Sequence, residues 1–212
     1  MSAKTKRTSL RDQAKAMFRD AILQAAEDVF AERGFHTARI QDIAKRARIG
    51  VGTVYNHFDQ KDDVLLALLT ERGDELKAEF SARDDDPKEW EPRLRARLGR
   101  LFGYVEQHRN YFRVACDLGL FGPGHPGLPV ELRQERRARF INELKLLIEE
   151  GMAGGQLQRA DVARISRFFS GAVRGVLEGA MLDGITDLQA EVSQVVDLFI
   201  RAAGASHSKG AR

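Results

Sequence analysis

Residues 37–61 have the sequence T-A-R-I-Q-D-I-A-K-R-A-R-I-G-V-G-T-V-Y-N-H-F-D-Q-K, and this stretch predicts two short helices joined by a tight turn. Apolar residues recur at helical spacing in the first helix and give it one buried face: Ile40, Ile43, Ala44 and Ala47. Thr37 stands where the N-cap of this helix belongs. The turn at 48–50 leads into a second helix, about Val51–Phe58, which is too short to be stable alone. The pattern predicts a helix-turn-helix, in which the second helix lies in a DNA major groove.

The outward face of the second helix carries side chains that suit a DNA surface. Gly52 has no side chain and lets the helix backbone approach DNA closely. Thr53 and Tyr55 offer hydroxyls to phosphates, and Asn56 can form a bidentate pair with adenine. The alternative for Tyr55 and His57 is that both side chains pack inside the small domain.

The same residues resemble the signature of the TetR (tetracycline-repressor-like) transcriptional regulators. The matching positions are I43-A44-(x4)-I49-(x2)-G52-T53-V54-Y55-N56-H57-F58-(x2)-K61, and the similarity covers about residues 17–70. Beyond these residues, only the chain length and the order of the helices agree with the family. The resemblance implies phosphate contacts at five positions: Thr37, Thr53, Tyr55, His57 and Lys61. It also implies that three residues lie nearest the base edges: Val51, Gly52 and Asn56.

Two positions in the turn depart from the pattern of the TetR family. The family usually has Gly where this chain has Arg48, and a positive φ there would cost an Arg about 1 kcal/mol. We expect the exposed guanidinium of Arg48 to offset this cost by reaching a phosphate. Gly50 occupies the position of the usual Ser or Thr cap and is a weaker cap than either.

The composition is that of an ordinary soluble protein, with 43% hydrophobic and 31% charged residues in a chain of 212. The longest apolar run, at 64–69, is far shorter than the roughly 20 residues of a membrane span. The basic N-terminal stretch also lacks the hydrophobic region of a signal peptide. The single Cys116 excludes an internal disulfide and is compatible with a reducing cytosol, so we expect a cytoplasmic protein.

Positive charge is concentrated at the N-terminal end of the chain, although the overall net charge is only +3. Residues 1–60 contain 11 Lys and Arg against 7 Asp and Glu, a balance of +4, whereas the remainder contains 23 against 24. This asymmetry is the electrostatic footprint expected for phosphate contact. Residues 1–15 form a basic arm that is either a disordered tail or an arm that follows phosphates or enters the minor groove.

Helical periodicity continues through the rest of the chain and no strand pattern persists, so the predicted fold is all-α with about nine helices. We expect an N-terminal arm and a three-helix DNA-binding domain at 1–61, whose first helix covers about 15–33. An effector-binding and dimerisation domain follows at 62–204, and its first helix, at about 62–82, links the two domains. Residues 205–212 are expected to be a disordered tail.

The last two helices, at about 161–183 and 188–203, are predicted to form a dimer interface. Glycines repeat every four residues along the first of them: Gly171, Gly175 and Gly179. Such a stripe indicates a surface that another helix approaches closely. The second helix carries an apolar stripe of Val192, Val195, Val196 and Phe199. Two copies of this pair would form a four-helix bundle across a two-fold axis, and the alternative is that both helices pack within the monomer core.

Aromatic residues are frequent in the C-terminal half, and core packing is their ordinary explanation. TetR-like proteins usually hold an effector pocket among these helices, which implies five candidate contacts: Phe102, Tyr111, Phe112, Cys116 and Phe169. The sequence contains no phosphate-binding loop, no nucleophile motif and no cluster at metal-ligand spacing. We therefore expect no catalytic residues, no metal and no cofactor.

These observations lead to one hypothesis and two alternatives. The hypothesis is a one-component transcriptional repressor that binds a palindromic operator as a homodimer and responds to an unknown small molecule. As the resemblance implies, the ligand would favour a conformation in which the spacing between the two recognition helices is wrong for the operator. The alternatives are an effector-independent DNA-binding protein, and a small-molecule-binding helical protein whose helix-turn-helix is only structural.

Overall fold

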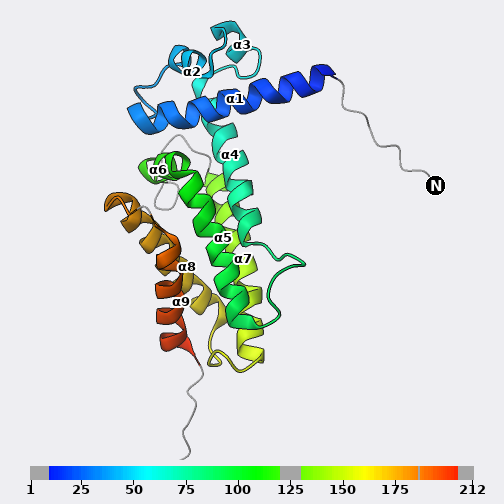
Figure 1. Cartoon of the computed structure of the whole chain (residues 1–212), viewed down its shortest axis with the longest axis vertical. Coiled ribbons are helices and arrows are strands. Elements are labelled where there is room, and N and C mark those ends of the chain that lie inside the picture. The colour runs from blue at the N-terminus through cyan, green and yellow to red at the C-terminus, as the bar shows by residue number, and fades with distance from the viewer. Residues whose placement is uncertain (1–9, 120–129, 186, 205–212) are drawn as a thin grey trace, which may run out of the picture. The chain divides into compact units, whose positions relative to one another are not determined.

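The computed structural model describes residues 10–119, 130–185 and 187–204 (Figure 1). In these ranges the chain forms α1 (Leu10–Arg33), α2 (Ile40–Ala47), α3 (Val51–Tyr55), α4 (Lys61–Phe80), α5 (Trp90–Gln107), α6 (Arg109–Asp117), α7 (Val130–Ala153), α8 (Val162–Leu182) and α9 (Gln189–Ala203). The only extended pairing among the described residues is an isolated bridge between Leu157 and Gly204. The predicted all-α fold is therefore confirmed, while the predicted tail at 205–212 lies outside the described residues.

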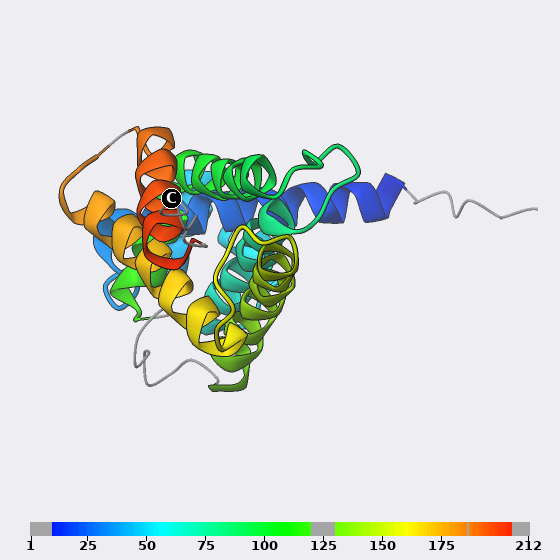
Figure 2. The same ribbon diagram turned by 90° about the horizontal axis from the view of Figure 1, so that it is seen from below.

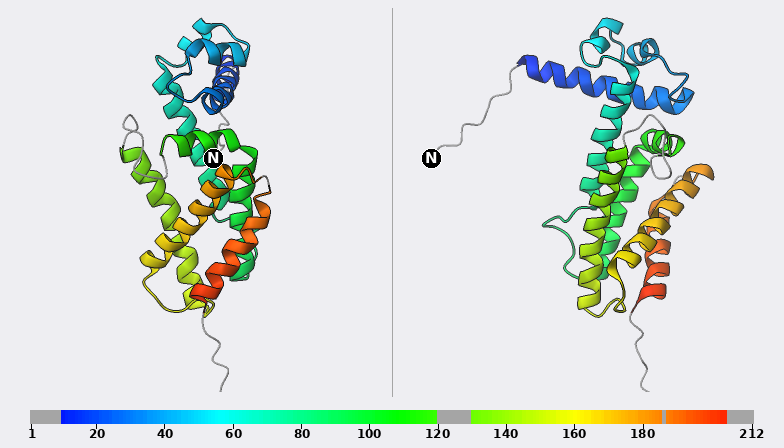
Figure 3. Two further views of the ribbon diagram at one scale, coloured as in Figure 1. Left: turned by 90° about the vertical axis from the view of Figure 1, so that its left-hand side faces the viewer. Right: turned by 180° about the vertical axis from the view of Figure 1, so that it is seen from behind.

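The chain divides into two compact units, one up to Arg72 and one from Gly73 onward. The boundary falls within α4, whereas the sequence placed it just before this helix. In the first unit, α2 packs on α1 and α3 packs on α2 (Figure 1, Figure 3). The core of this unit draws on all four helices: Ile22, Phe30, Ile43, Val54, Leu65 and Leu68. Burial of Val54 explains how a helix as short as α3 is stable here, because isolated helices of this length are not.

Two arginines tie α2 and α4 to α1. Arg46 of α2 pairs with two carboxylates of α1, Asp28 (Nη1–Oδ2 3.3 Å) and Glu32 (Nη2–Oε2 2.5 Å). Arg72 of α4 pairs with Glu27 at 3.0 Å, and the Glu27 side chain is only 3% exposed. Exposed pairs contribute at most about 1 kcal/mol, but breaking a buried pair leaves an uncompensated charge. The Arg72–Glu27 pair therefore fixes how α4 lies on α1.

In the second unit, α5, α7, α8 and α9 form a ring in which each helix contacts the next, and α6 packs against α5 and α8 (Figure 2). The core is apolar, and its fully buried members include Leu94, Leu98, Phe102, Leu144 and Val196. Trp90 is buried where α5 meets α7, and its Nε1–H donates a 2.6 Å hydrogen bond to the carbonyl oxygen of Leu147. A Cβ on Gly151 would lie 2.6 Å from the Trp90 ring, so this close approach of the two helices requires glycine.

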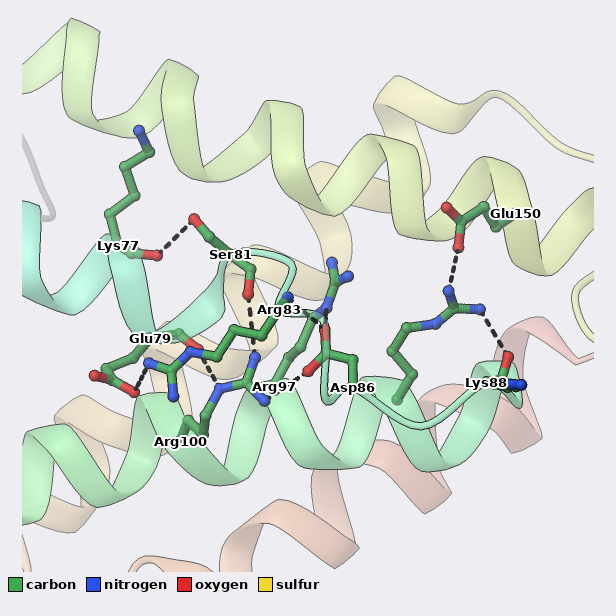
Figure 4. A network of polar contacts seen from close by, with 10 residues as sticks. Lys77, Glu79, Ser81, Arg83, Asp86, Lys88, Arg97, Arg100 and Glu150 are labelled. Carbon is green, nitrogen blue, oxygen red and sulfur yellow. Dashed lines mark hydrogen bonds and ion pairs between the residues drawn. The ribbon is translucent and has the colours of Figure 1, made fainter. Parts of the chain in front are cut away.

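A buried polar network fixes the segment between α4 and α5 (Figure 4). The Asp86 carboxylate accepts from Arg97 Nε at 2.8 Å and from Arg100 Nη1 at 2.7 Å. Arg100 also donates to the carbonyl oxygens of Glu79 and Ser81. Burial by itself raises the pKa of Asp86, but the hydrogen bonds from Arg100 and Arg97 outweigh it and lower this pKa. The ionised carboxylate thus holds the segment against α5.

Two helix boundaries in the first unit differ from the prediction. α1 starts at Leu10 and not near Lys15, so residues 10–15 of the predicted arm are helical, while residues 1–9 lie outside the described part of the chain. α3 ends at Tyr55 and not at Phe58, because the His57 N–H donates to the Val54 carbonyl at 2.9 Å and tightens the chain into a turn. Asn56 and His57 therefore lie in the turn after α3.

Candidate nucleic-acid interface

The exposed face of α3 is formed by Gly52 and Tyr55, and Asn56 continues it directly after the helix. Tyr55 is 49% exposed, whereas Val54 on the opposite face is completely buried. A Cβ on Gly52 would have no neighbour within 4 Å, so the fold itself does not require a glycine there. The remaining candidates from this segment are half-buried at the edges of the face: Val51, Thr53 and His57.

The turn before α3 places Arg48 in the left-handed region of the backbone. Arg48 has φ 57° and ψ 40°, and it is the only non-glycine residue with positive φ in the described part of the chain. Its N–H donates to the Lys45 carbonyl at 3.2 Å, and the N–H of Ile49 donates to Ala44 at 3.0 Å, which closes the end of α2. Gly50 is the N-cap of α3 and supplies no side-chain hydrogen bond. The side chain of Arg48 is exposed beside this turn.

The N-terminus of α2 differs from the prediction. Its N-cap is Arg39 and not Thr37, because the chain between α1 and α2 continues for two more residues before α2 starts. The Asp42 carboxylate accepts the Arg39 N–H at 3.1 Å and so satisfies one of the free donors of the helix start. Thr37 is exposed in the preceding turn, where its hydroxyl is accessible to a phosphate.

Lys61 does not have the environment of a phosphate ligand. Its Nζ donates to three carbonyl oxygens in the turn between α1 and α2: Phe35 (2.6 Å), His36 (3.2 Å) and Ala38 (2.9 Å). The ammonium also lies 4.5 Å from the centroid of the Phe35 ring. An ammonium has three N–H donors, so all of them are used within the chain. Lys61 thus holds the turn that carries Thr37, and the phosphate contact that the resemblance implies is not the contact its amine makes in this structure.

The rings of Phe18 and Phe58 are both near His57, with each centroid 6.4 Å from that of the imidazole. Burial lowers the pKa of His57, and the nearby charges of Lys15 and Arg19 lower it further. The imidazole is therefore more readily neutral in the free protein than an exposed histidine. A phosphate close to it would favour the charged form instead.

The helix-turn-helix and its supporting helices match the sequence model of a known family. The family is described as bacterial regulatory proteins of the tetR family, and its model matches residues 22–68. This range runs from the buried part of α1 into α4 and includes every candidate DNA contact. The chain belongs to the TetR family.

Other TetR-type regulators are similar to this chain over most of its length. The fatty acid metabolism regulator protein of Bacillus subtilis is 28% identical over 188 residues, which are 84% of this chain and 92% of that protein. The structure of FadR from Bacillus subtilis in complex with stearoyl-CoA has 25% identity and a TM-score of 0.71, covering 85% of this chain and 97% of FadR. The SmeT–triclosan complex has 25% identity and a TM-score of 0.71, covering 90% and 93% of the two chains. SmeT is the repressor of the multidrug efflux pump SmeDEF in Stenotrophomonas maltophilia.

The effector candidates of this TetR-family chain all lie in the second unit. Four of them are buried, with at most 2% of the side chain exposed: Phe102, Tyr111, Phe112 and Phe169. Cys116 is half-buried, and burial raises the pKa of its thiol to about 12, with further contributions from Glu178 and Asp117. Phe169 packs closely on Phe199, with the two rings tilted by 42° and their centroids 4.2 Å apart. These residues are part of the packed interior, and their contact with an effector stays a prediction.

The predicted dimer residues fall into two groups. The apolar stripe of α9 lies inside the chain, because α9 packs on α5 and exposes at most 6% of each of these side chains: Val192, Val195, Val196 and Phe199. These four residues are core residues and offer almost no surface to a partner. For α9, packing within the monomer core was the alternative to a dimer interface. The glycine stripe of α8 is different, because a Cβ at each position would have no neighbour within 4 Å: Gly171, Gly175 and Gly179.

Three apolar residues of α8 and α9 that were not predicted as interface residues from the sequence remain exposed. Phe168 is 59% exposed, Leu182 is 87% exposed, and Leu198 of α9 is 61% exposed. The signal was present in the sequence, since Phe168, Gly175 and Leu182 are spaced seven residues apart and therefore lie on one face of α8.

The described residues contain neither a candidate membrane span nor a candidate metal site. No helix among them has both the length and the hydrophobicity to span a membrane. In the same residues, no three His, Cys, Asp or Glu side chains come together in a way that could hold a metal ion.

Proposed function

We propose that this TetR-family protein is a transcriptional repressor that binds a palindromic operator as a homodimer and releases it on binding a small-molecule effector. The proposed DNA binding is supported above all by the exposed polar face of α3. The opposite face of α3 packs into a core that it shares with α1, α2 and α4. A helix presented in this way enters a major groove in helix-turn-helix proteins. Operator DNA as the partner also places the protein in the cytoplasm.

On this proposal, the candidate residues have three kinds of role. Asn56 and Val51 contact base edges, and Gly52 lets the backbone come close enough for them to do so. Hydroxyls and cations contact phosphates and set the register on the duplex: Thr37, Arg48, Thr53, Tyr55 and His57. Lys61 supports these contacts indirectly, because it holds the turn that carries Thr37.

The dimer forms through the exposed face of α8, which combines the glycine stripe with apolar residues. Phe168 and Leu182 flank the stripe at either end, and Leu198 extends the apolar surface onto α9. α8 and α9 contact each other within the chain, so two copies produce a four-helix bundle. A two-fold axis of this kind matches two half-sites one helical turn apart, about 34–36 Å.

The effector we propose is a molecule with a long apolar chain, first of all a long-chain acyl-coenzyme A. The similarity to FadR, which was solved with stearoyl-CoA, supports this class of ligand. Four of the candidate contacts belong to one hydrophobic cluster of the second unit, Phe102, Phe112, Cys116 and Phe169, and Tyr111 is buried in the same unit. Arg113 lies on the same helix as three of them and is exposed, so it offers a cation to the phosphates of the coenzyme.

Fluorescence anisotropy with a labelled duplex from upstream of the protein's own gene tests both parts of the proposal. We expect binding that prefers this duplex to a scrambled one, and loss of binding when stearoyl-CoA is added. Coenzyme A without the acyl chain is the matched control and should leave the complex intact. Equal affinity for the two duplexes would refute the regulatory function, whereas operator binding that resists stearoyl-CoA would refute the class of effector.

A further inference from the structure

The net positive charge of the DNA-binding unit does not lie on the helix-turn-helix itself. Residues 1–21 contain six Lys and Arg against two Asp and Glu, a balance of +4. Residues 22–60 contain five against five, so they have no net charge. Attraction of the DNA backbone depends on Lys and Arg that neutralise phosphates. Within this unit, the excess positive charge therefore lies in residues 1–21, which precede the range that the TetR family model matches.

Part of this basic stretch is an exposed helix. α1 starts at Leu10, yet its first buried residue is Ile22. Residues 10–21, here named the α1 extension, are about 18 Å long at 1.5 Å per residue. The extension projects beyond α3 within the first unit (Figure 1, Figure 3). Because it buries no core residue, the packing of the unit does not explain why the helix is prolonged.

The last turn of the α1 extension is fixed against the segment that ends the recognition helix. The ring of Phe18 lies 6.4 Å from that of His57, and the Arg19 guanidinium lies 5.0 Å above the Phe58 ring. Arg19 is also held by Glu71 of α4, with an Nε–Oε1 distance of 2.8 Å. These contacts orient the extension relative to α3.

The two remaining cations of the extension are available to a partner. Arg11 and Lys15 are four residues apart, and Phe18 follows three residues later, so all three share one side of α1. Both cations are exposed, and neither is paired with a carboxylate within the described part of the chain. Lys15 lies close enough to His57 for its charge to act on the imidazole. The cations therefore start beside the end of α3 and continue away from it along the extension.

We propose that the α1 extension is a second DNA-contacting element, in which Arg11 and Lys15 bind phosphates beside the half-site that α3 contacts. This inference rests on the proposed DNA-binding function, because contact with the end of α3 is what orients the extension. Its length corresponds to about five base pairs at 3.4 Å each. Contacts of this kind add affinity and set position, and they carry no direct sequence preference.

The test is the salt dependence of operator binding by Arg11→Gln/Lys15→Gln. Glutamine removes the charge and has a helix propensity close to that of Arg and Lys, so the helix is kept. The matched control is Lys88→Gln/Arg159→Gln, which removes two exposed cations from the second unit and changes the net charge equally. Between about 50 and 200 mM salt, each lost phosphate contact reduces the slope of log K against log salt by about 0.9. We expect a reduction of about 1.8 for the first variant and none for the control.

The ratio of the affinity for the operator to the affinity for the scrambled duplex should stay at the wild-type value in both variants. A hydroxyl-radical footprint should lose protection outside the half-sites only in Arg11→Gln/Lys15→Gln. Equal slopes for this variant and its control would overturn the proposal. A fall in thermal stability or loss of the dimer with an unchanged slope would also overturn it, and would assign the extension to packing within or between chains. Absence of operator preference in the wild type would refute the proposed function instead, so the two failures are distinguishable.

Discussion

Two faces of the molecule carry glycines that the folded chain does not require, one at Gly52 on α3 and one at Gly175 on α8. A Cβ at either position would meet no neighbouring atom within 4 Å in the described part of the chain. A Cβ on Gly151, in contrast, would lie 2.6 Å from Trp90. Gly151 leaves room for a side chain of the same molecule, whereas Gly52 and Gly175 leave room for something outside it.

The surroundings of the two open glycines indicate different partners. Gly52 is followed on its face by the exposed Tyr55, whose hydroxyl suits a phosphate. Gly175 lies seven residues from both Phe168 and Leu182, which are apolar and more than half exposed. A missing side chain indicates close approach in both cases, and the neighbouring chemistry distinguishes DNA from a second copy of the chain.

Gly175→Leu should have the largest effect, because it places a bulky side chain where the second copy approaches. We expect a monomer in light scattering and an operator affinity lower by about 100-fold or more, since two linked half-sites no longer bind together. The monomer itself should be no less stable, because Leu is favoured over Gly in helices by about 0.8 kcal/mol.

Gly151→Ala is the contrasting control for this experiment. It should keep the dimer and reduce the free energy of unfolding by about 1–3 kcal/mol through overpacking against Trp90. A wild-type dimerisation constant in Gly175→Leu would move the interface away from the glycine stripe of α8.

Gly52→Leu should affect DNA binding alone. The side chain has space in the free protein but would stand between α3 and the major groove. We expect operator affinity to fall by about 10- to 100-fold, or about 1.4–2.8 kcal/mol, with the dimer unchanged and the thermal unfolding temperature no lower than in the wild type. Gly52→Ala should fall between this variant and the wild type. An affinity in Gly52→Leu that equals the wild type would show that this face does not approach DNA.

Lys61→Met tests whether Lys61 stabilises the turn between α1 and α2 or contacts DNA itself. We expect the free energy of unfolding to fall by about 1.5–3 kcal/mol, because the three carbonyl oxygens lose their charged donor. The salt slope of operator binding should stay at its wild-type value. Lys45→Met removes an exposed charge from α2 and should change stability by less than about 0.5 kcal/mol. A slope reduced by about 0.9 in Lys61→Met would instead restore the phosphate contact.

The smallest effect concerns the pH dependence of the DNA-binding unit. Burial, followed by the charges of Lys15 and Arg19, lowers the pKa of His57 from its ordinary value of 6.5. The unfolded chain therefore binds this proton more readily, and stability is lost as the pH falls below about 6.5 towards the folded-state pKa. NMR titration should give a pKa for His57 below 6.5 in the wild type and a higher one in Lys15→Gln. A pKa that does not change in Lys15→Gln would remove Lys15 from the surroundings of His57.

The sequence was sufficient to predict those features of the helix-turn-helix that depend only on local backbone geometry. A tight turn between two short helices requires a left-handed residue, and Arg48 has the expected positive φ. Lys61 shows the limit of this reasoning. Its position at the start of α4 is the same whether its long side chain points to a phosphate or to the carbonyl oxygens of the α1–α2 turn. Only the folded position of that turn distinguishes the two.

The C-terminal helices show a second limit. An apolar stripe such as Val192 to Phe199 indicates that a helix face is buried, but not whether the burying surface belongs to the same chain or to another copy. In the structure α5 covers this stripe, and the large apolar residues of α8 and α9 that stay exposed are Phe168, Leu182 and Leu198. The aromatic effector candidates have the same ambiguity, since an aromatic residue in a core and one beside a ligand follow the same spacing.

The most direct test of the central claim is the affinity of the wild-type protein for a palindromic duplex from upstream of its own gene, measured against a scrambled duplex at one salt concentration. We expect a preference of about 1,000-fold or more for the palindrome. In Asn56→Ala, the discrimination at one symmetric base pair should fall by about 1–3 kcal/mol. Equal affinity of the wild type for the two duplexes would contradict the claim that α3 contacts a specific operator.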